Sequence, residues 1–179
     1  APFHDSDPNA AIELIIRPQQ SFGTGHHPTT MLIAEKLLTM ALAERYILDL
    51  GCGTGVLAIL ASRLGAGKVD AVDIESLAVE NAIENAQHNS INSITFCQGD
   101  TSCLHGKKYD VVIANINKNI LMSAIPDFTS SINSGGDLLL SGFFGMDCEA
   151  LVNAARLDFD LQEIKHNGEW AMIHFRRKN

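Results

Sequence analysis

The stretch Ile47-Leu-Asp-Leu-Gly-Cys-Gly-Thr-Gly55 decides the fold that this sequence predicts. Apolar residues over 46–50 are typical of a short buried strand, and the alternating glycines predict a tight loop before a helix over 56–64. Glycine lets the backbone turn sharply and lets a ligand approach where a Cβ atom would collide. The first N–H groups of the helix lack partners within it and face the same loop. The stretch therefore predicts a strand, loop and helix that bind a ligand.

A second strand with a terminal carboxylate strengthens this prediction. Residues 69–73 are expected to form a strand that ends in Asp73. In nucleotide-binding β-α-β units, a carboxylate at this place accepts hydrogen bonds from ribose hydroxyls. A glycine loop alone is a weak signal, but the loop and Asp73 together predict a cofactor that contains a nucleoside.

The spacing of the glycines distinguishes two kinds of nucleoside cofactor. The dinucleotide fingerprint requires a third glycine at residue 56, which is valine here. The carboxylate of Asp49 also faces the loop, where it suits a cationic amino group better than a pyrophosphate. S-adenosylmethionine carries such an amino group and a ribose diol but no phosphate. The pattern Asp-x-Gly-x-Gly-x-Gly resembles motif I of the class I methyltransferases, in which a residue placed like Asp73 holds the ribose. The residues of this motif are Asp49, Gly51, Gly53 and Gly55.

The composition limits the classes of protein that fit. With 179 residues, 46% of them hydrophobic, the chain can form one domain with a core on both faces of a sheet. A net charge of −8 without a long basic run argues against general binding to nucleic acid. No apolar run approaches the length of a membrane span, and we expect a cytoplasmic protein without a signal peptide. The scattered cysteines are predicted to be reduced thiols, not disulfides or zinc ligands. They are Cys52, Cys97, Cys103 and Cys148.

Strands and helices alternate along the chain. Strands are expected at 12–16, 46–50, 69–73, 94–98, 109–114 and 137–141, and an antiparallel pair at 159–165 and 170–175. Helices are expected at 29–42 with His27 as cap, 56–64, 77–89 with Ser76 as cap, 120–132 with Ser134-Gly135-Gly136 as stop, and 146–157. This order predicts an α/β fold, a doubly wound, mostly parallel, Rossmann-like seven-stranded sheet with an antiparallel C-terminal hairpin. Residues 1–11 are expected to be a linker before one domain over 12–179.

Four polar side chains fall at the ends of successive predicted strands. They are Asp49, Asp73, Asp100 and Asn115. Each alone fits a helix cap or turn equally well. Ligands of open α/β sheets bind beyond the carboxyl ends of the strands, so the four together favour a site. In related methyltransferases a residue placed like Asp100 faces the adenine, and Asn115 is expected beside the sulfonium, where it positions an incoming amine.

A second glycine loop carries a more specific resemblance. The sequence Phe22-Gly-Thr-Gly-x-His-x-Thr-Thr30, followed by the loop at 51–55, by Asn115-Ile and by Gly168-Glu-Trp170, closely resembles the bacterial enzymes that methylate large-subunit ribosomal protein eleven. The likeness covers residues 15–175. It implies that the loop over 22–30 folds over the methionine end of S-adenosylmethionine. The cofactor contacts implied by this resemblance are Phe22, Thr24, Thr30, Gly51, Asp73 and Asn115.

The chain also departs from that family. His26 replaces a frequent threonine, and Asn117-Lys118 replaces a small or apolar pair near the acceptor pocket. Family members carry an N-terminal domain that grips the ribosomal protein, and we expect this sequence to begin in the linker after it. It would then be either an excised catalytic domain or a stand-alone relative. The pair His26-His27 lacks partners at ligand spacing, so no metal site is predicted.

Three functions remain open at this point. Transfer of methyl groups to lysine side chains and the N-terminal amine of a ribosomal protein fits best. Such transfer is an in-line displacement that needs an aligned, unprotonated amine, not a covalent catalyst, and no general base is assigned. A methyltransferase for small molecules or glutamine side chains is an alternative, although Asn-Pro-Pro-Tyr of the glutamine enzymes is absent. A non-catalytic module that binds the cofactor is the third.

Overall fold

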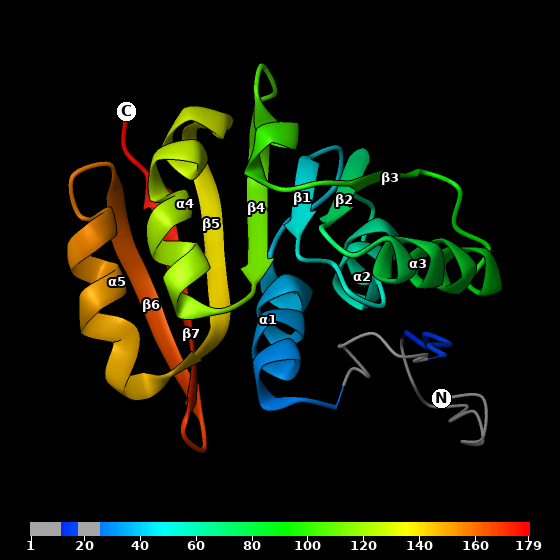
Figure 1. Ribbon diagram of the computed structural model, residues 1–179, viewed down its shortest axis with the longest axis horizontal. Coiled ribbons are helices and arrows are strands. Elements are labelled where there is room, and N and C mark those ends of the chain that lie inside the picture. Colours follow the sequence, from blue (N-terminus) through cyan, green and yellow to red (C-terminus); the bar gives the residue numbers. More distant parts are fainter. Residues whose placement is uncertain (1–11, 18–25) are drawn as a thin grey trace.

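A single seven-stranded sheet organises the molecule. In the computed structural model, residues 12–17 and 26–179 are described. The strand order is β3-β2-β1-β4-β5-β7-β6, and Figure 1 shows it from β6 on the left to β3 on the right. Strands β1 to β5 run parallel, whereas β7 is antiparallel to both β5 and β6. The predicted fold class, including the C-terminal hairpin, is confirmed.

The bounds of the elements follow the predicted order. The strands are β1 (Tyr46–Leu50), β2 (Lys68–Asp73), β3 (Ile94–Gln98), β4 (Tyr109–Asn115), β5 (Ile132–Phe144), β6 (Phe159–Asn167) and β7 (Trp170–Arg177). The helices are α1 (Pro28–Thr39), α2 (Val56–Arg63), α3 (Ser76–His88), α4 (Lys118–Ser131) and α5 (Cys148–Ala155), with short 3-10 turns η1 (Thr101–Leu104) and η2 (Gly145–Asp147). No helix in the described parts is both long and apolar enough to cross a membrane.

Both faces of the sheet are covered, which explains the nearly continuous apolar strands. Successive side chains of β1 point to opposite faces, so Ile47 packs in the core with α1 and α2, whereas Leu48 packs in the core with α4 and α5. The same alternation in β4 places Val111 and Val112 in different cores. Because helices cover both faces of the sheet, a ligand can reach it at the ends of the strands.

The predicted strand at 12–16 is wrong. Residues 12–17 join no sheet. Their backbone forms hydrogen bonds with the side-chain amides of asparagines in α3 and at its C-cap, Asn89. Asn89 accepts a hydrogen bond from Ile15 N (2.9 Å) and donates one to Ile15 O (2.8 Å). Asn85 Oδ1 accepts from Arg17 N (2.8 Å), and Asn81 Nδ2 donates to Arg17 O (3.0 Å). The three asparagines lie one turn apart on one helix face and replace a neighbouring strand.

Helix termini account for the other differences. Glu75 is the N-cap of α3, so Ser76 is the first helical residue and not the predicted cap. The predicted stop 134–136 lies inside β5, which begins directly after α4. A Cβ atom on Gly136 would lie 3.0 Å from Asp110 O, so glycine permits the close approach of β5 to β4 there. Helices α1 and α5 are shorter than predicted. His27 is the N-cap of α1, as expected, and its side chain accepts a hydrogen bond from Thr29 N.

Candidate active site

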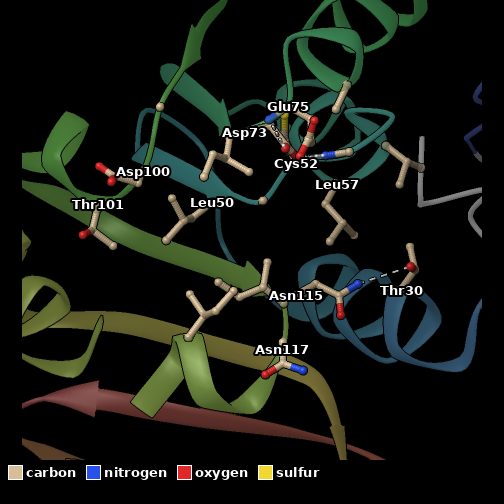
Figure 2. Close-up of a pocket in the computed structure, with 18 of the residues that line it drawn as sticks. Thr30, Leu50, Cys52, Leu57, Asp73, Glu75, Asp100, Thr101, Asn115 and Asn117 are labelled. Carbon is tan, nitrogen blue, oxygen red and sulfur yellow. Dashed lines mark hydrogen bonds between the residues drawn. The ribbon is translucent and has the colours of Figure 1, made fainter. Parts of the chain in front are cut away.

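A cavity of about 580 Å³ opens at the carboxyl ends of β1, β2, β3 and β4. Figure 2 shows Asp100 and Thr101 at one end of it and Asn115, Asn117 and Thr30 at the other, with Asp73 between β1 and α3. This is the edge of the sheet at which the sequence predicted a site. The residues that line it are Thr30, Leu50, Gly51, Cys52, Gly53, Val56, Leu57, Asp73, Ile74, Glu75, Leu77, Ala78, Gly99, Asp100, Thr101, Asn115, Ile116, Asn117 and Ile120.

The glycine loop forms the floor of the cavity. Gly51 and Gly53 line it with positive φ angles of 74° and 54°. A Cβ atom on Gly51 would collide with the side chain of Ile116, so only glycine fits between β1 and the end of β4. Gly55 does not line the cavity. Its missing Cβ instead lets α2 begin against Ala82 of α3, which would lie 2.9 Å away.

Asp73 holds the loop in place. Its Oδ2 accepts a hydrogen bond from Gly53 N (2.8 Å), and its Oδ1 accepts one from Glu75 N (3.1 Å). The carboxylate therefore joins the end of β2 to the glycine loop and to the start of α3, while it lines the cavity (Figure 2). A carboxylate has about four acceptor positions, so two of them stay available to donors of a ligand.

Asp49 lies behind the loop and not on the cavity wall. It is buried, and its Oδ2 accepts a hydrogen bond from Ala58 N (3.0 Å) in the first turn of α2. No hydrogen-bond partner among the described residues reaches its Oδ1. Burial raises the pKa of Asp49, the Ala58 bond opposes this, and the charge of Asp73 adds to it, so the pKa lies at about 7. This position indicates that Asp49 supports the N-terminus of α2. It does not favour the expected contact of Asp49 with a cationic amino group of the cofactor.

Asn115 and Thr30 meet at the opposite end of the cavity. Asn115 ends β4, and its Nδ2 donates to Oγ1 of Thr30 in α1 (3.3 Å, Figure 2). The Oδ1 of Asn115 is buried without a hydrogen-bond partner in the described residues. A buried carbonyl oxygen of this kind is costly unless a donor meets it, and the cavity is where a ligand could supply that donor.

The hairpin fixes the position of α1 and thereby of Thr30. The ring of Trp170 in β7 lies edge-on to His27, with centroids 4.7 Å apart, and His27 caps α1. Phe144 packs on the same indole at 4.4 Å. His27, from the sequence of the second glycine loop, and Trp170, from the Gly-Glu-Trp segment, therefore meet at the N-terminus of α1.

Asp100 lies at the far end of the cavity, as expected. It is the N-cap of η1, and its Oδ1 accepts a hydrogen bond from Ser102 N (2.9 Å). Bonds from the side chain and backbone of Ser102 hold the pKa of Asp100 below its ordinary value, so it is a carboxylate at neutral pH. Phe22 and Thr24, also expected at the site, lie outside the described residues.

The sequence analysis missed the apolar walls and the polar residues Glu75 and Thr101. Ile74 and Leu77 are 67% and 62% exposed yet line the cavity, and Glu75 lies between them. Ile74 comes directly after the strand-end carboxylate Asp73, and this position was the sequence signal that could have predicted the apolar wall. Asn117 also lines the cavity and caps α4, while its neighbour Lys118 turns to Asp147 (2.8 Å). No three His, Cys, Asp or Glu side chains in the described part of the chain could hold a metal ion.

The parallel sheet with its antiparallel β7, the glycine loop, and the polar groups at strand ends define a class I methyltransferase fold. The family model of ribosomal protein L11 methyltransferase (PrmA) matches residues 1–178, and the chain belongs to this family.

Known proteins agree with this assignment. The ribosomal protein L11 methyltransferase of Porphyromonas gingivalis is 46% identical over 98% of this chain and 61% of its own length. That of Bacteroides fragilis is 42% identical over 97% of this chain and 62% of its own length. The chain thus spans about three fifths of these curated relatives. The crystal structure of the ribosomal protein L11 methylase of Lactobacillus delbrueckii has a TM-score of 0.88 and 30% identity, covering 99% of this chain and 91% of that one.

Proposed function

We propose that this domain transfers methyl groups from S-adenosylmethionine to amino groups of large-subunit ribosomal protein L11. The observation that carries the proposal is one cavity that Asp73, the glycine loop and Asn115 line together. Membership of the L11 methyltransferase family supports the acceptor. The cavity volume of about 580 Å³ lies within the range of small-molecule and cofactor sites.

The residues present fit S-adenosylmethionine. Free acceptor positions on Asp73 suit the ribose hydroxyls, and the apolar side chains of Leu50, Ile74 and Leu77 suit an adenine between them, with Asp100 at its edge. Gly51 and Gly53 leave room for the methionine part. The cofactor, when bound, supplies a sulfonium-activated methyl group, and the protein need not activate a leaving group.

The role of the protein is to align an amine and to exclude water. The Oδ1 of Asn115 accepts a hydrogen bond from the neutral acceptor amine and directs the nitrogen lone pair at the methyl carbon. Thr30 holds the amide in this orientation through the bond from Asn115 Nδ2. Lys118 is paired with Asp147 and does not line the cavity, so no role in alignment is assigned to it.

The experiment is a binding titration followed by methyl transfer. Calorimetry with S-adenosylmethionine and with NAD tests the cofactor, and heat with NAD alone would overturn the proposal. Labelled cofactor and purified L11 then test the acceptor, with Asn115→Ala and Lys118→Ala as the pair of variants. We expect Asn115→Ala to lower kcat by about 100-fold and to change cofactor affinity less, since it loses positioning. Lys118→Ala should keep most of the activity.

A further inference from the structure

Two of the four cysteines face one another beside the cavity. Cys97 lies in β3 and Cys103 in η1, and their Sγ atoms are 3.4 Å apart. All four cysteines are free thiols, and these two are partly exposed, whereas Cys52 and Cys148 are buried. An oxidant in solution therefore reaches the pair more readily than the other two thiols.

The pair is close to the geometry of a disulfide. A disulfide joins its sulfur atoms at about 2.05 Å, so the two Sγ atoms need to approach by roughly 1.4 Å. Cys103 belongs to a 3-10 turn of four residues, and a rotation of its side chain with a small shift of this turn can supply that movement. The bond would close a small ring over residues 97–103.

This ring contains one wall of the cavity. Gly99, Asp100 and Thr101 lie between the two cysteines and line the cavity. The Sγ of Cys103 already lies against Gly99, since a Cβ atom added there would collide with it. Movement of Cys103 towards Cys97 is therefore transmitted to the backbone of Gly99 and to the hydrogen bond between Asp100 and Ser102.

We propose that Cys97 and Cys103 form a reversible dithiol–disulfide pair that reshapes the cavity wall at residues 99–101. The oxidant is a low-molecular-weight disulfide such as oxidised glutathione. One cysteine thiolate attacks it and displaces one glutathione, and the second cysteine then attacks the mixed disulfide and displaces the other. The protein loses two electrons and two protons, which leave on two molecules of reduced glutathione.

The surroundings of Cys103 affect the rate of this exchange. Hydrogen bonding to Cys97, then burial, raises the pKa of Cys103; the charges of Cys97 and Asp100 add to this, and Lys107 opposes it. The thiolate is the attacking form, so the raised pKa slows attack by Cys103.

The first experiment maps the bond itself. The whole chain is equilibrated in buffers of oxidised and reduced glutathione, alkylated, digested and analysed by mass spectrometry. We expect a linked peptide of Cys97 and Cys103, which dithiothreitol removes. Cys148→Ala should form it as the parent does, whereas Cys97→Ser and Cys103→Ser should carry at most a mixed disulfide with glutathione. Absence of the linked peptide in oxidised glutathione alone, or linkage through Cys52 or Cys148, would overturn the proposal.

The second experiment measures the effect on the cavity and rests on the proposed function. Calorimetry compares the reduced and oxidised protein for binding of S-adenosylmethionine. We expect the oxidised form to bind roughly three- to tenfold more weakly, and the affinity of the double variant Cys97→Ser/Cys103→Ser to be unaffected by oxidised glutathione. A linked protein with unchanged affinity would refute the reshaping. If the reduced protein bound no S-adenosylmethionine, the proposed function would fail, while the peptide map would still decide whether the bond forms.

Discussion

Carboxylates lie near both ends of the parallel strands, but those near the amino ends, Asp70 and Asp137, meet cations, whereas Asp49, Asp73 and Asp100 near the carboxyl ends meet none in the described part of the chain. Asp70 Oδ2 accepts hydrogen bonds from Lys107 (2.7 Å), Tyr46 (2.6 Å) and Tyr109 (3.0 Å). Near the carboxyl ends, the described residues form no salt bridge to Asp49, Asp73 or Asp100. These three accept bonds from backbone N–H groups instead.

A second buried carboxylate near the amino ends repeats the pattern. Asp137 of β5 contacts Arg45 (2.7 Å), His174 (2.8 Å) and Arg176 (3.2 Å). Burial alone would raise the pKa of Asp137, but the bonds from His174 and Arg45 and the charge of Arg176 hold it below its ordinary value. The carboxylates that bind several cationic side chains stabilise the sheet, and Asp73 and Asp100, which line the cavity, keep acceptor positions for a ligand.

Loss of an amino-end carboxylate should have the largest effect. Asp137→Ala leaves the partly buried Arg45, His174 and Arg176 without their common partner, so we expect unfolding free energy to fall by about 4 kcal/mol. Affinity for S-adenosylmethionine should be nearly unchanged below the melting point. Urea unfolding and calorimetry measure the two quantities. Asp160→Ala, which removes an exposed ion pair to Lys178, is the control and should cost less than about 1 kcal/mol.

The pH dependence of stability tests whether Asp49, near the carboxyl end of β1, supports the fold and not a ligand. Its folded-state pKa of about 7 is raised above the unfolded value of about 3.9, so the unfolded chain ionises first as pH increases. The parent should therefore lose on the order of 3 kcal/mol of stability between about pH 4 and pH 7 through this group. Asp49→Asn should lack that loss. If the stability difference between the two proteins stayed constant from pH 4 to pH 8, Asp49 would not titrate in this way.

Asp73→Ala should change binding more than stability. Loss of two charge-assisted hydrogen bonds to the ribose is expected to weaken affinity for S-adenosylmethionine by about ten- to a hundredfold. The N–H groups of Gly53 and Glu75 lose their acceptor but remain near solvent, so stability should fall by only about 1 kcal/mol. Calorimetry and the melting temperature of the same variant separate the roles. A lower melting temperature with parental affinity would make Asp73 a purely structural residue.

The smallest effect is expected at Asp100. Asp100→Ala removes the cap of η1 and should lower the melting temperature only slightly, together with a severalfold loss of cofactor affinity. Asp100→Asn keeps an acceptor for Ser102 N and should retain the stability. If Asp100→Ala weakened cofactor binding more than Asp73→Ala does, the proposal that Asp73 contributes more to this binding would be wrong.

The sequence predicted most of the sheet and six of the residues that line the cavity, which are Thr30, Gly51, Gly53, Asp73, Asp100 and Asn115. The strand–glycine–helix unit and Asp73 were predictable because turn chemistry and strand ends act over a few residues. Gly55 and Asp49 were assigned to ligand contact, yet they support the packing and the N-terminus of α2, since only the three-dimensional approach of α3 and burial behind the loop distinguish the two roles. The bonds from Asn81, Asn85 and Asn89 to residues 15–17 depend on contacts over more than 60 residues of sequence, for which no local pattern exists.

Those asparagines hold the segment 12–17 by its main chain, while the side chain of Ile16 packs in a core cluster with Ile59 and Ala86. Glu13, Ile15 and Arg17 are exposed, so many residue types could replace them without loss of docking. Proline is the exception at positions 15 and 17, because it lacks the N–H group that Asn89 or Asn85 accepts. Asn85 also donates to the carbonyl oxygen of Thr54 (3.0 Å), next to the glycine loop. The three asparagines thus leave the exposed positions 13, 15 and 17 open to many side chains but require an intact backbone, whereas the buried Ile16 requires an apolar side chain.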